Sequence, residues 1–195
     1  IILPSYFFRL LMRDPKKYKQ TDPSKWNSKS LTLENYSHFN VYGSNGDCNI
    51  FGYDVICCFA NITNQHWIIL VANVKQSSIT LFDPMNGIKK AEGNVWLESF
   101  KRYLNDERSY IVDVDYNASV NMQKEVNWNC TVHRISQANE QQDTHNCGVY
   151  CLAYMECVLR GISLKCVHED TIINYRKLIA LTILTGKNFL RPQDI

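Results

Sequence analysis

The sequence lacks long apolar runs, a strong excess of charge of one sign, and internal repeats. No apolar run approaches the roughly 18 residues that a membrane-spanning helix needs, and no charged segment followed by an apolar one marks a signal peptide. The 21 basic and 19 acidic residues give a net charge of only +2, so neither nucleic acid nor a membrane surface is expected as the main partner. The 195 residues are 45% hydrophobic, which is the composition of an ordinary globular protein with one core.

The eight cysteines lack the spacing of a structural zinc site or of a small disulfide-rich domain. No CxxC pair is present, and this pair is the usual signature of such zinc sites. Cys57 and Cys58 are adjacent and would lie on opposite faces of a strand, while Cys147 and Cys151 lie one helical turn apart. We therefore expect free thiols and a reducing compartment, the nucleus or the cytoplasm, although a secreted effector acting inside a host cell would also fit. Four Asn-x-Ser/Thr triplets are the counter-evidence, and they matter only in the secretory pathway.

Short β-rich apolar runs indicate a sheet. Residues 54–60, 66–74 and 77–83 form three such runs, and the Lys-Gln pair between the last two predicts a tight turn. We therefore expect three neighbouring antiparallel strands. Residues 109–114 and 130–135 are two further strand candidates.

Helical periodicity is present in three segments. Residues 94–104 place six apolar side chains on one stripe, and residues 147–159 form a periodic pattern that stops at Gly161, a natural C-terminal cap. A last helix is expected after Asp170 as its N-cap and before Gly186. Strands flanked by helices predict an α+β fold. The stripe consists of Val95, Trp96, Leu97, Phe100, Tyr103 and Leu104.

Cys147 stands where a polar, amide-rich loop meets a small apolar helix. A cysteine nucleophile reacts as its thiolate, and a free thiol with a pKa of about 8.5 supplies little of it at neutral pH. A helix N-terminus and a neighbouring imidazolium both lower that pKa, and Cys147 would have the first of these. The pattern favours a nucleophile over a buried structural thiol, which is our interpretation of Cys57, Cys58, Cys151 and Cys157.

His66 is the histidine best placed to activate that thiol. It begins the expected strand 66–74, and Asp83 ends the next strand, so a tight turn between the two strands would bring these side chains together. A carboxylate in that position orients the imidazole and fixes its tautomer. His145 is the rival base because it is only two residues from Cys147, but no carboxylate of defined geometry accompanies it.

Gln141 is the candidate donor to the oxyanion that forms when a carbonyl is attacked. It lies six residues before Cys147, in the loop that leads into the helix, and the backbone N–H of Cys147 is a second candidate. A shift of one residue would give the role to Gln142 instead. Asp143 fits a turn better than it fits an alternative carboxylate.

The order His, Asp, Gln, Cys, in "NQHWIILVAN", "ITLFDPMNG" and "QQDTHNCGVY", resembles the ubiquitin-like-protein proteases, which mature and remove SUMO and, in one branch, NEDD8. The stretches "LPSYFFRLL" and "IINYRKLIALTIL" resemble the Phe-rich segment and closing helix of that family. The resemblance implies a papain-like α+β fold with a central mixed sheet, over a single catalytic domain at 1–195. It also implies cleavage after the Gly-Gly terminus of a modifier, with Trp67 over a tunnel that admits only diglycine. No metal or other cofactor is implied, because a thiolate and an imidazole supply the nucleophile and the proton shuttle.

Several departures from the family are visible. Residue 146 is Asn where the family most often has Asp, and the Trp-Leu-x-Asp helix that precedes the Phe-rich segment is not in the sequence, so we expect the natural domain to begin earlier. Residues 14–52 follow no family pattern. SUMO is the first choice of partner, and NEDD8 and ubiquitin stay open. The alternatives are a deubiquitinase or deneddylase, a viral or transposon polyprotein protease, a bacterial effector, an acetyltransferase on a related fold, and a catalytically idle module that binds a modifier.

Overall fold

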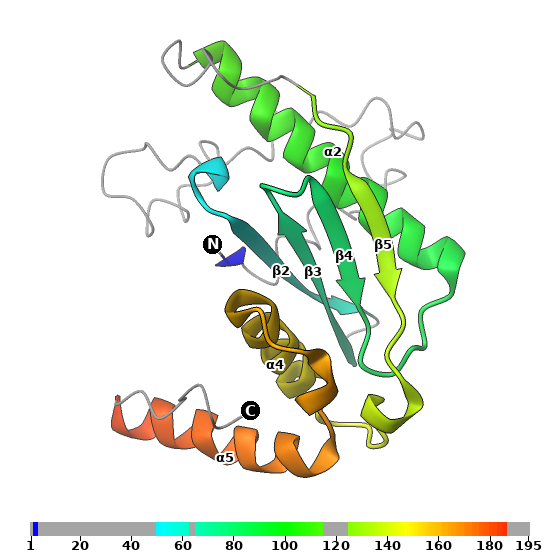
Figure 1. Cartoon of the computed structure of the whole chain (residues 1–195), viewed down its shortest axis with the longest axis vertical. Helices are drawn as coiled ribbons and strands as arrows, with labels where there is room; N and C mark the ends of the chain where they lie inside the picture. The colour runs from blue at the N-terminus through cyan, green and yellow to red at the C-terminus, as the bar shows by residue number, and fades with distance from the viewer. Residues whose placement is uncertain (1, 4–49, 63–64, 115–124, 187–195) are drawn as a thin grey trace.

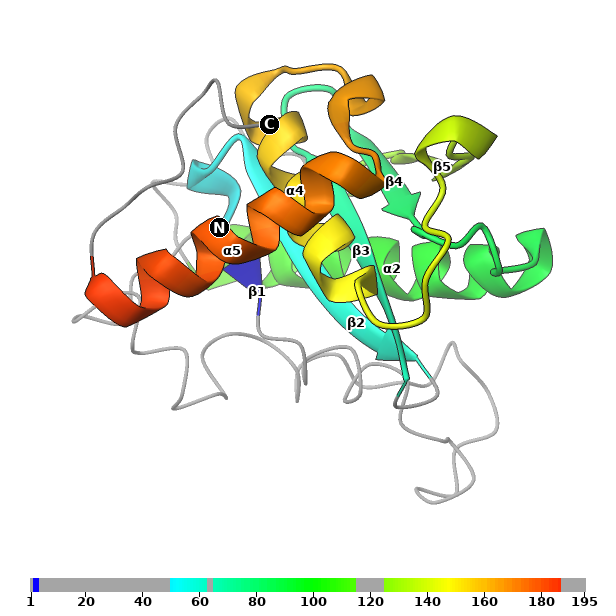
Figure 2. The same cartoon turned by 90° about the horizontal axis from the view of Figure 1, so that it is seen from below.

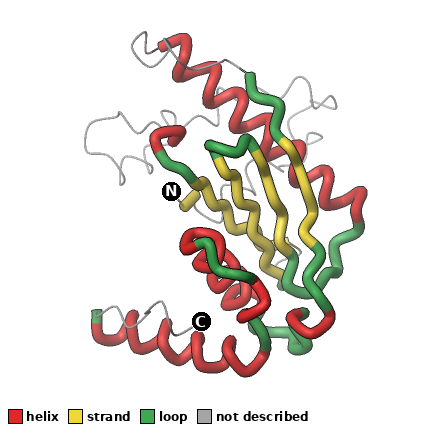
Figure 3. The backbone as a smooth tube through the Cα atoms, viewed as in Figure 1, coloured by secondary structure: helices red, strands yellow, loops and turns green. Residues whose placement is uncertain are grey.

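The computed structural model describes residues 2–3, 50–62, 65–114 and 125–186. The described strands form one five-stranded sheet in the order β1-β2-β3-β4-β5 (Figure 1; Figure 3). The central strands are antiparallel to one another, whereas β1 and β5 run parallel to their neighbours, so the sheet is mixed. The strands are β1 (Ile2–Leu3), β2 (Val55–Ile62), β3 (His66–Asn73), β4 (Ser78–Phe82) and β5 (Asn129–His133).

The three central strands confirm the three apolar runs that the sequence analysis assigned to an antiparallel sheet. Cys57 and Cys58 are both buried but belong to separate hydrophobic clusters, one on each face of β2, as expected for adjacent residues in a strand. Strand β5 confirms the candidate at 130–135. Because Ile69 pairs with Phe82, the beginning of β3 lies beside the residues that follow β4.

Helices cover both faces of the sheet (Figure 2). One face packs against α2 (Lys90–Val114), through a core that includes Leu97, Phe100 and Leu104. The other face packs against α4 (Cys147–Arg160), and α5 (Glu169–Thr185) in turn packs on α4. These layers confirm the α+β fold. The short 3-10 helices are η6 (Ile50–Gly52), η7 (Gln137–Asn139) and η8 (Leu164–Cys166).

The expected strand at 109–114 is wrong, because these residues form the last turns of α2. Their β-branched and aromatic composition reflects a preference for packing on a pleated surface, and that preference yields to tertiary context. The position beside β4 is already taken by β5. Extending a helix that has already formed adds one hydrogen bond for each residue fixed, so continuing α2 is favoured in free energy over forming a separate strand.

Two details of the helices also differ from expectation. Val95 is 53% exposed and does not belong to the buried stripe of α2, since consecutive helical residues are 100° apart and Val95, Trp96 and Leu97 cannot share one face. Helix α5 begins at Glu169 with His168 as its N-cap, because the Thr171 hydroxyl accepts the His168 N–H at 3.0 Å. Asp170 therefore lies in the first turn, where its charge still favours the helix dipole.

The C-terminal caps are as expected. Gly161 and Gly186 have φ values of 67° and 64°, the left-handed region in which a glycine ends a helix without steric cost. Most of the Phe-rich segment at residues 3–11 and of the unaligned region at 14–52 lies outside the described residues. No helix in the described part of the chain is long and apolar enough to span a membrane.

Candidate active site

Cys147 is the first residue of α4, as the sequence pattern predicts, and its side chain is buried. The N–H groups of a first helical turn have no partner within the helix. The positive end of the helix dipole lies there and favours a thiolate over a thiol. The Trp67 backbone N–H contacts the Cys147 sulfur at 3.4 Å, and the Gln65 carbonyl lies 3.9 Å from it. The thiol therefore lies against the beginning of β3.

His66 and Asp83 meet at the same end of the sheet. The His66 Nε2 atom lies 2.6 Å from Asp83 Oδ1, although the residues are 17 positions apart. The Asp83 carboxylate also accepts the Met85 N–H at 3.0 Å and the Ile88 N–H at 2.7 Å. Burial acts to raise the pKa of Asp83, but the hydrogen bonds from His66, Ile88 and Met85 outweigh it and lower that pKa. The carboxylate is thus ionised and holds the imidazole.

Asp83 bonds one ring nitrogen of His66 and leaves the other, Nδ1. Nδ1 is buried and has no hydrogen-bond partner in the part of the chain that the structure describes. Asp83 occupies Nε2 and fixes the proton there, so Nδ1 is the atom left to accept a proton. Trp67, one peptide bond away, touches the Cys147 sulfur, which brings imidazole and thiol to one site.

Gln141 lies in the loop before Cys147, and only 4% of it is exposed. Its backbone N–H donates to the Pro84 carbonyl at 2.9 Å, which fixes the loop to the end of β4. Its side-chain Nε2 donates to the backbone oxygen and to Oδ1 of Asp143, at 2.9 and 2.8 Å. The Gln141 amide is therefore already hydrogen-bonded to Asp143 within its own loop. An oxyanion would have to compete with Asp143 for the amide N–H groups.

Asp143 organises that loop. Its Oδ1 accepts the backbone N–H groups of His145 and Asn146, both at 2.9 Å, which is the turn role expected from the sequence. Partial burial acts to raise its pKa, but the hydrogen bonds from His145, Asn146 and Gln141 lower the pKa of Asp143 to about 2. The side chain of His145, the rival base, is 69% exposed and lies 3.8 Å from Asp143.

A hydrogen-bonded chain from α5 to this loop was missed by the sequence analysis. Arg176 Nη1 donates to Asn146 Oδ1, and Asn146 Nδ2 donates to Asp143 Oδ2, both at 2.5 Å. An aspartate at position 146 would place a second carboxylate against Asp143, whereas the asparagine amide donates to it. The only sequence signal was this Asn in place of the usual Asp. Its buried position now has a physical reason.

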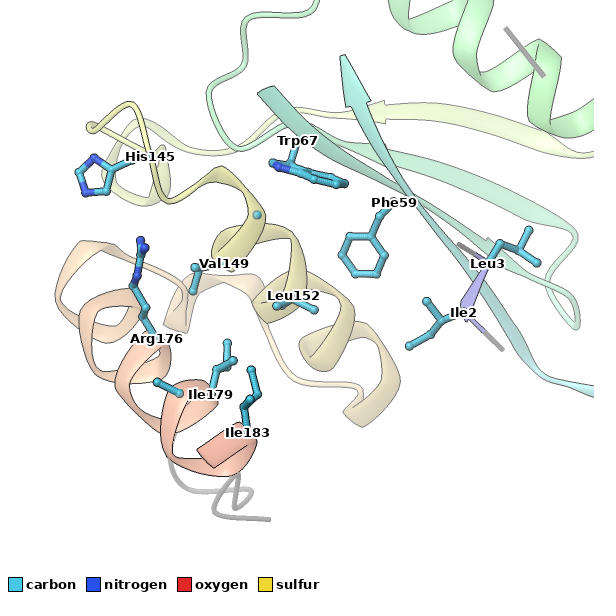
Figure 4. A pocket seen from close by; sticks show the side chains of 12 residues that line it. Ile2, Leu3, Phe59, Trp67, His145, Val149, Leu152, Arg176, Ile179 and Ile183 are labelled. Atoms are coloured by element: carbon cyan, nitrogen blue, oxygen red, sulfur yellow. The ribbon is translucent and has the colours of Figure 1, made fainter. Parts of the chain in front are cut away.

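Trp67 forms one wall of an apolar groove beside the thiol (Figure 4). A Cβ at position 148 would stand 3.5 Å from the indole, so the ring packs closely over Gly148, the residue after Cys147. The groove has a volume of about 610 Å³ and continues between α4 and α5, where Leu152 and Ile179 line it. No group of three or more metal-ligating side chains is found among the described residues.

A thiol at a helix N-terminus, next to an imidazole that a carboxylate orients, defines the papain-like class of cysteine protease on this α+β fold. The chain belongs to the Ulp1 protease family: the model of the family's C-terminal catalytic domain matches residues 1–185. It is accordingly a cysteine protease.

Solved structures of the family share the fold. The C-terminal Ulp1 protease domain in complex with Smt3, the yeast ortholog of SUMO, superposes with a TM-score of 0.65 at 16% identity, over 95% of this chain and 67% of that chain. The catalytic domain of the Chaetomium thermophilum Ulp1-like SUMO protease gives 0.55 at 18% identity, over 97% and 62%. The SUMO protease Ulp1 with its catalytic cysteine oxidised to a sulfonic acid gives 0.65 at 16%, over 95% and 69%. None of the curated proteins matches the sequence.

Proposed function

We propose that this protein is a cysteine isopeptidase that cleaves after the C-terminal Gly-Gly of a ubiquitin-like modifier, in precursors or in lysine conjugates, with SUMO as the first choice. The observation that carries the proposal is the contact of His66 with Asp83 at 2.6 Å, beside a thiol at the N-terminus of α4. The solved complex of the Ulp1 domain with Smt3 supports a modifier of the SUMO kind. In this proposal, residues 1–195 belong to one catalytic domain.

The proposed reaction begins with proton transfer from Cys147 to Nδ1 of His66. The thiolate attacks the carbonyl carbon of the second glycine, and the C–N bond to the leaving amine breaks after His66 returns the proton to that nitrogen. Water, deprotonated by His66, then hydrolyses the thioester and releases the modifier's carboxylate. Asp83 keeps the ring oriented and stabilises its charged form.

The oxyanion that forms in each step would be stabilised by the Cys147 N–H and by Gln141. Since Gln141 donates to Asp143 in the absence of substrate, its amide would exchange one of these bonds for the oxyanion. One such donor is worth about 10²–10³ in rate. The loop's anchor on Pro84 keeps the amide within the site while this exchange occurs.

Trp67 is the proposed specificity wall. The indole packs over the first turn of α4 and leaves little space between the ring and the thiol for a substrate backbone. Only glycine lacks a side chain that would collide with the ring. A diglycine terminus can therefore lie extended under Trp67, whereas any Cβ at those two positions would meet the wall. The aromatic face also excludes water from the bond under attack.

Covalent capture tests the proposal. The purified protein and its Cys147→Ala variant are incubated with SUMO, NEDD8 and ubiquitin, each carrying a C-terminal electrophile. We expect an adduct with the SUMO probe that depends on Cys147. An adduct with NEDD8 or ubiquitin alone would make the protein a deneddylase or a deubiquitinase. No adduct with any probe would reject modifier cleavage and leave a polyprotein protease or an idle binding module.

We also propose a reducing compartment, the nucleus or the cytoplasm, for this protein. All seven cysteines in the described part of the chain are free thiols, and a thiolate nucleophile must stay reduced to act.

A further inference from the structure

Two cysteines outside the active site bring their sulfur atoms together. Cys157 lies in the last turns of α4 and is fully buried, whereas Cys166 ends η8 and is half-buried. Their Sγ atoms are 3.7 Å apart. Within the described residues, no other pair of cysteine side chains makes a sulfur–sulfur contact of this kind. The proposed mechanism uses neither thiol.

The backbone holds both residues in place. The Ile162 N–H donates to the Cys157 carbonyl at 2.8 Å, and the Thr171 hydroxyl donates to the Cys166 carbonyl at 2.9 Å. Asn139 also fixes this backbone, because its Nδ2 donates to the carbonyls of Lys165 and Val167, on either side of Cys166, at 2.9 Å each. The chain entropy of bringing the two thiols together has therefore already been lost on folding. A disulfide of about 2.05 Å needs only a modest further approach of the sulfur atoms.

We propose that Cys157 and Cys166 are an oxidation site, in which hydroperoxides oxidise the two thiols to a reversible disulfide between them. This proposal does not depend on the proposed isopeptidase function, because the pair lies at the opposite end of α4 from Cys147. The disulfide would close the loop from 157 to 166 and tie the end of α4 to the segment that begins α5. Intracellular disulfides of this kind are transient and respond to oxidants.

The two sulfur atoms have different roles in the step. Burial raises the pKa of Cys157 to about 12, and its contact with Cys166 adds to the effect. The partly accessible Cys166 is the thiol that meets peroxide first, since susceptibility follows thiolate character and exposure.

The step balances with hydrogen peroxide as the oxidant. The Cys166 sulfur attacks one peroxide oxygen, the O–O bond breaks, and one water leaves a sulfenic acid on Cys166. The Cys157 sulfur then attacks that sulfenic sulfur, the S–S bond forms, the S–O bond breaks, and the departing hydroxide takes the Cys157 proton as a second water. The two thiols lose two electrons and two protons in total, and peroxide is reduced to water.

Peptide mapping tests the site. The Cys147→Ala protein, which keeps the full chain but removes the proposed nucleophile as a competing thiol, is treated with hydrogen peroxide, alkylated and digested with trypsin without reductant. Cleavage after lysine and arginine places Cys157 in peptide 135–160 and Cys166 in peptide 166–176. We expect these two peptides to be joined, with a mass about 2 Da below their sum, and to separate on reduction with dithiothreitol.

Matched variants identify the partner within peptide 135–160, which also contains Cys151. Cys166→Ser and Cys157→Ser should each abolish the joined product, and Cys151→Ser should leave it unchanged. Joined peptides that persist in Cys157→Ser and disappear in Cys151→Ser would overturn the assignment. So would oxidation of Cys166 to a sulfinic acid without any joined product. Because Cys166 is half-buried, the Cys166→Ser variant keeps the test valid even if Cys157→Ser fails to fold.

Discussion

At the scale of single residues, the Asp83 carboxylate is the group on which the proposed chemistry depends most directly. Both of its oxygens are occupied, one by His66 and the Met85 N–H and the other by the Ile88 N–H. These contacts fix the carboxylate in place and lower its pKa, so it is held in its charged form. In the proposed mechanism they leave His66 Nδ1, rather than Nε2, to act as the base.

Asp83→Asn should lower kcat by about 10³–10⁴-fold with little change in KM. An asparagine amide can donate to His66 Nε2, which moves the ring proton to Nδ1 and removes the base. The measurement is hydrolysis of a fluorogenic modifier substrate. Asp54→Asn is the matched control, because Asp54 is an exposed carboxylate that pairs with Lys75 far from the thiol. Equal activity of the two variants would remove Asp83 from the mechanism.

Asp143 gives a prediction about acid stability. Its pKa in the folded protein is about 2, below the ordinary value of 3.8, so the charged form is the one that folding stabilises. This contribution is complete above a pH of about 4 and is lost as the pH falls toward 2. Asp143→Asn should therefore reduce the loss of stability between pH 4 and 2, measured as the midpoint of urea unfolding at each pH. An identical acid dependence in the variant and the parent would contradict the assigned hydrogen bonds.

At the scale of elements, α5 reaches the active-site loop through one side chain. Arg176 donates to Asn146, the residue directly before the proposed nucleophile Cys147, and Asn146 continues the chain to Asp143 and so to Gln141. The position and conformation of the loop that contains Asp143 and Asn146 thus depend on α5, a helix that contributes none of the proposed catalytic groups. We therefore propose Arg176 as a positioning residue that acts through its neighbours.

Arg176→Ala should lower kcat by about three- to tenfold, because one charge-assisted hydrogen bond at an exposed residue is worth roughly 1 kcal/mol. The loss should be in kcat more than in KM, since the bond holds the loop rather than the modifier. Lys177→Ala, the exposed neighbour on the same helix, is the control. If both variants lose activity equally, the effect belongs to the charge of α5 and not to the contact with Asn146.

Helix α2 provides a matched pair for stability. Phe100 is fully buried against the sheet, and Val95 on the same helix is 53% exposed. Phe100→Ala should cost about 3–5 kcal/mol of unfolding free energy through lost burial and the cavity left behind. Val95→Ala should change it by less than about 0.5 kcal/mol. Chemical denaturation of both variants gives these values, and a small loss at Phe100 would contradict the packing of α2 on the sheet.

At the scale of the whole molecule, the sequence predicted what depends on local patterns. The antiparallel strands around the Lys-Gln turn, and with them the contact of His66 with Asp83, follow from apolar runs and a two-stranded register. The helix that begins at Cys147 follows from its periodicity and from Gly161.

The failures share a cause, which is dependence on distant partners. Residues 109–114 were misassigned because the sheet edge they would have joined is filled by β5, a segment further along the chain. The contact of Arg176 with Asn146 joins residues 30 positions apart, and no short spacing rule indicates it. The engagement of Gln141 with Asp143 was missed because a side-chain amide has several equally near acceptors in such a loop.

The separation of the site's parts along the chain has a consequence for the order of assembly. His66 and Asp83 are brought together by one hairpin, whereas the thiol arrives from a segment 80 residues beyond Trp67. Local contacts form with little loss of chain entropy, and distant ones form later in folding. We therefore expect His66 and Asp83 to come together before Cys147 reaches them, so that in a partly folded chain this cysteine would lack its proposed base. The proposed catalytic group would be complete only when α4 docks on the sheet.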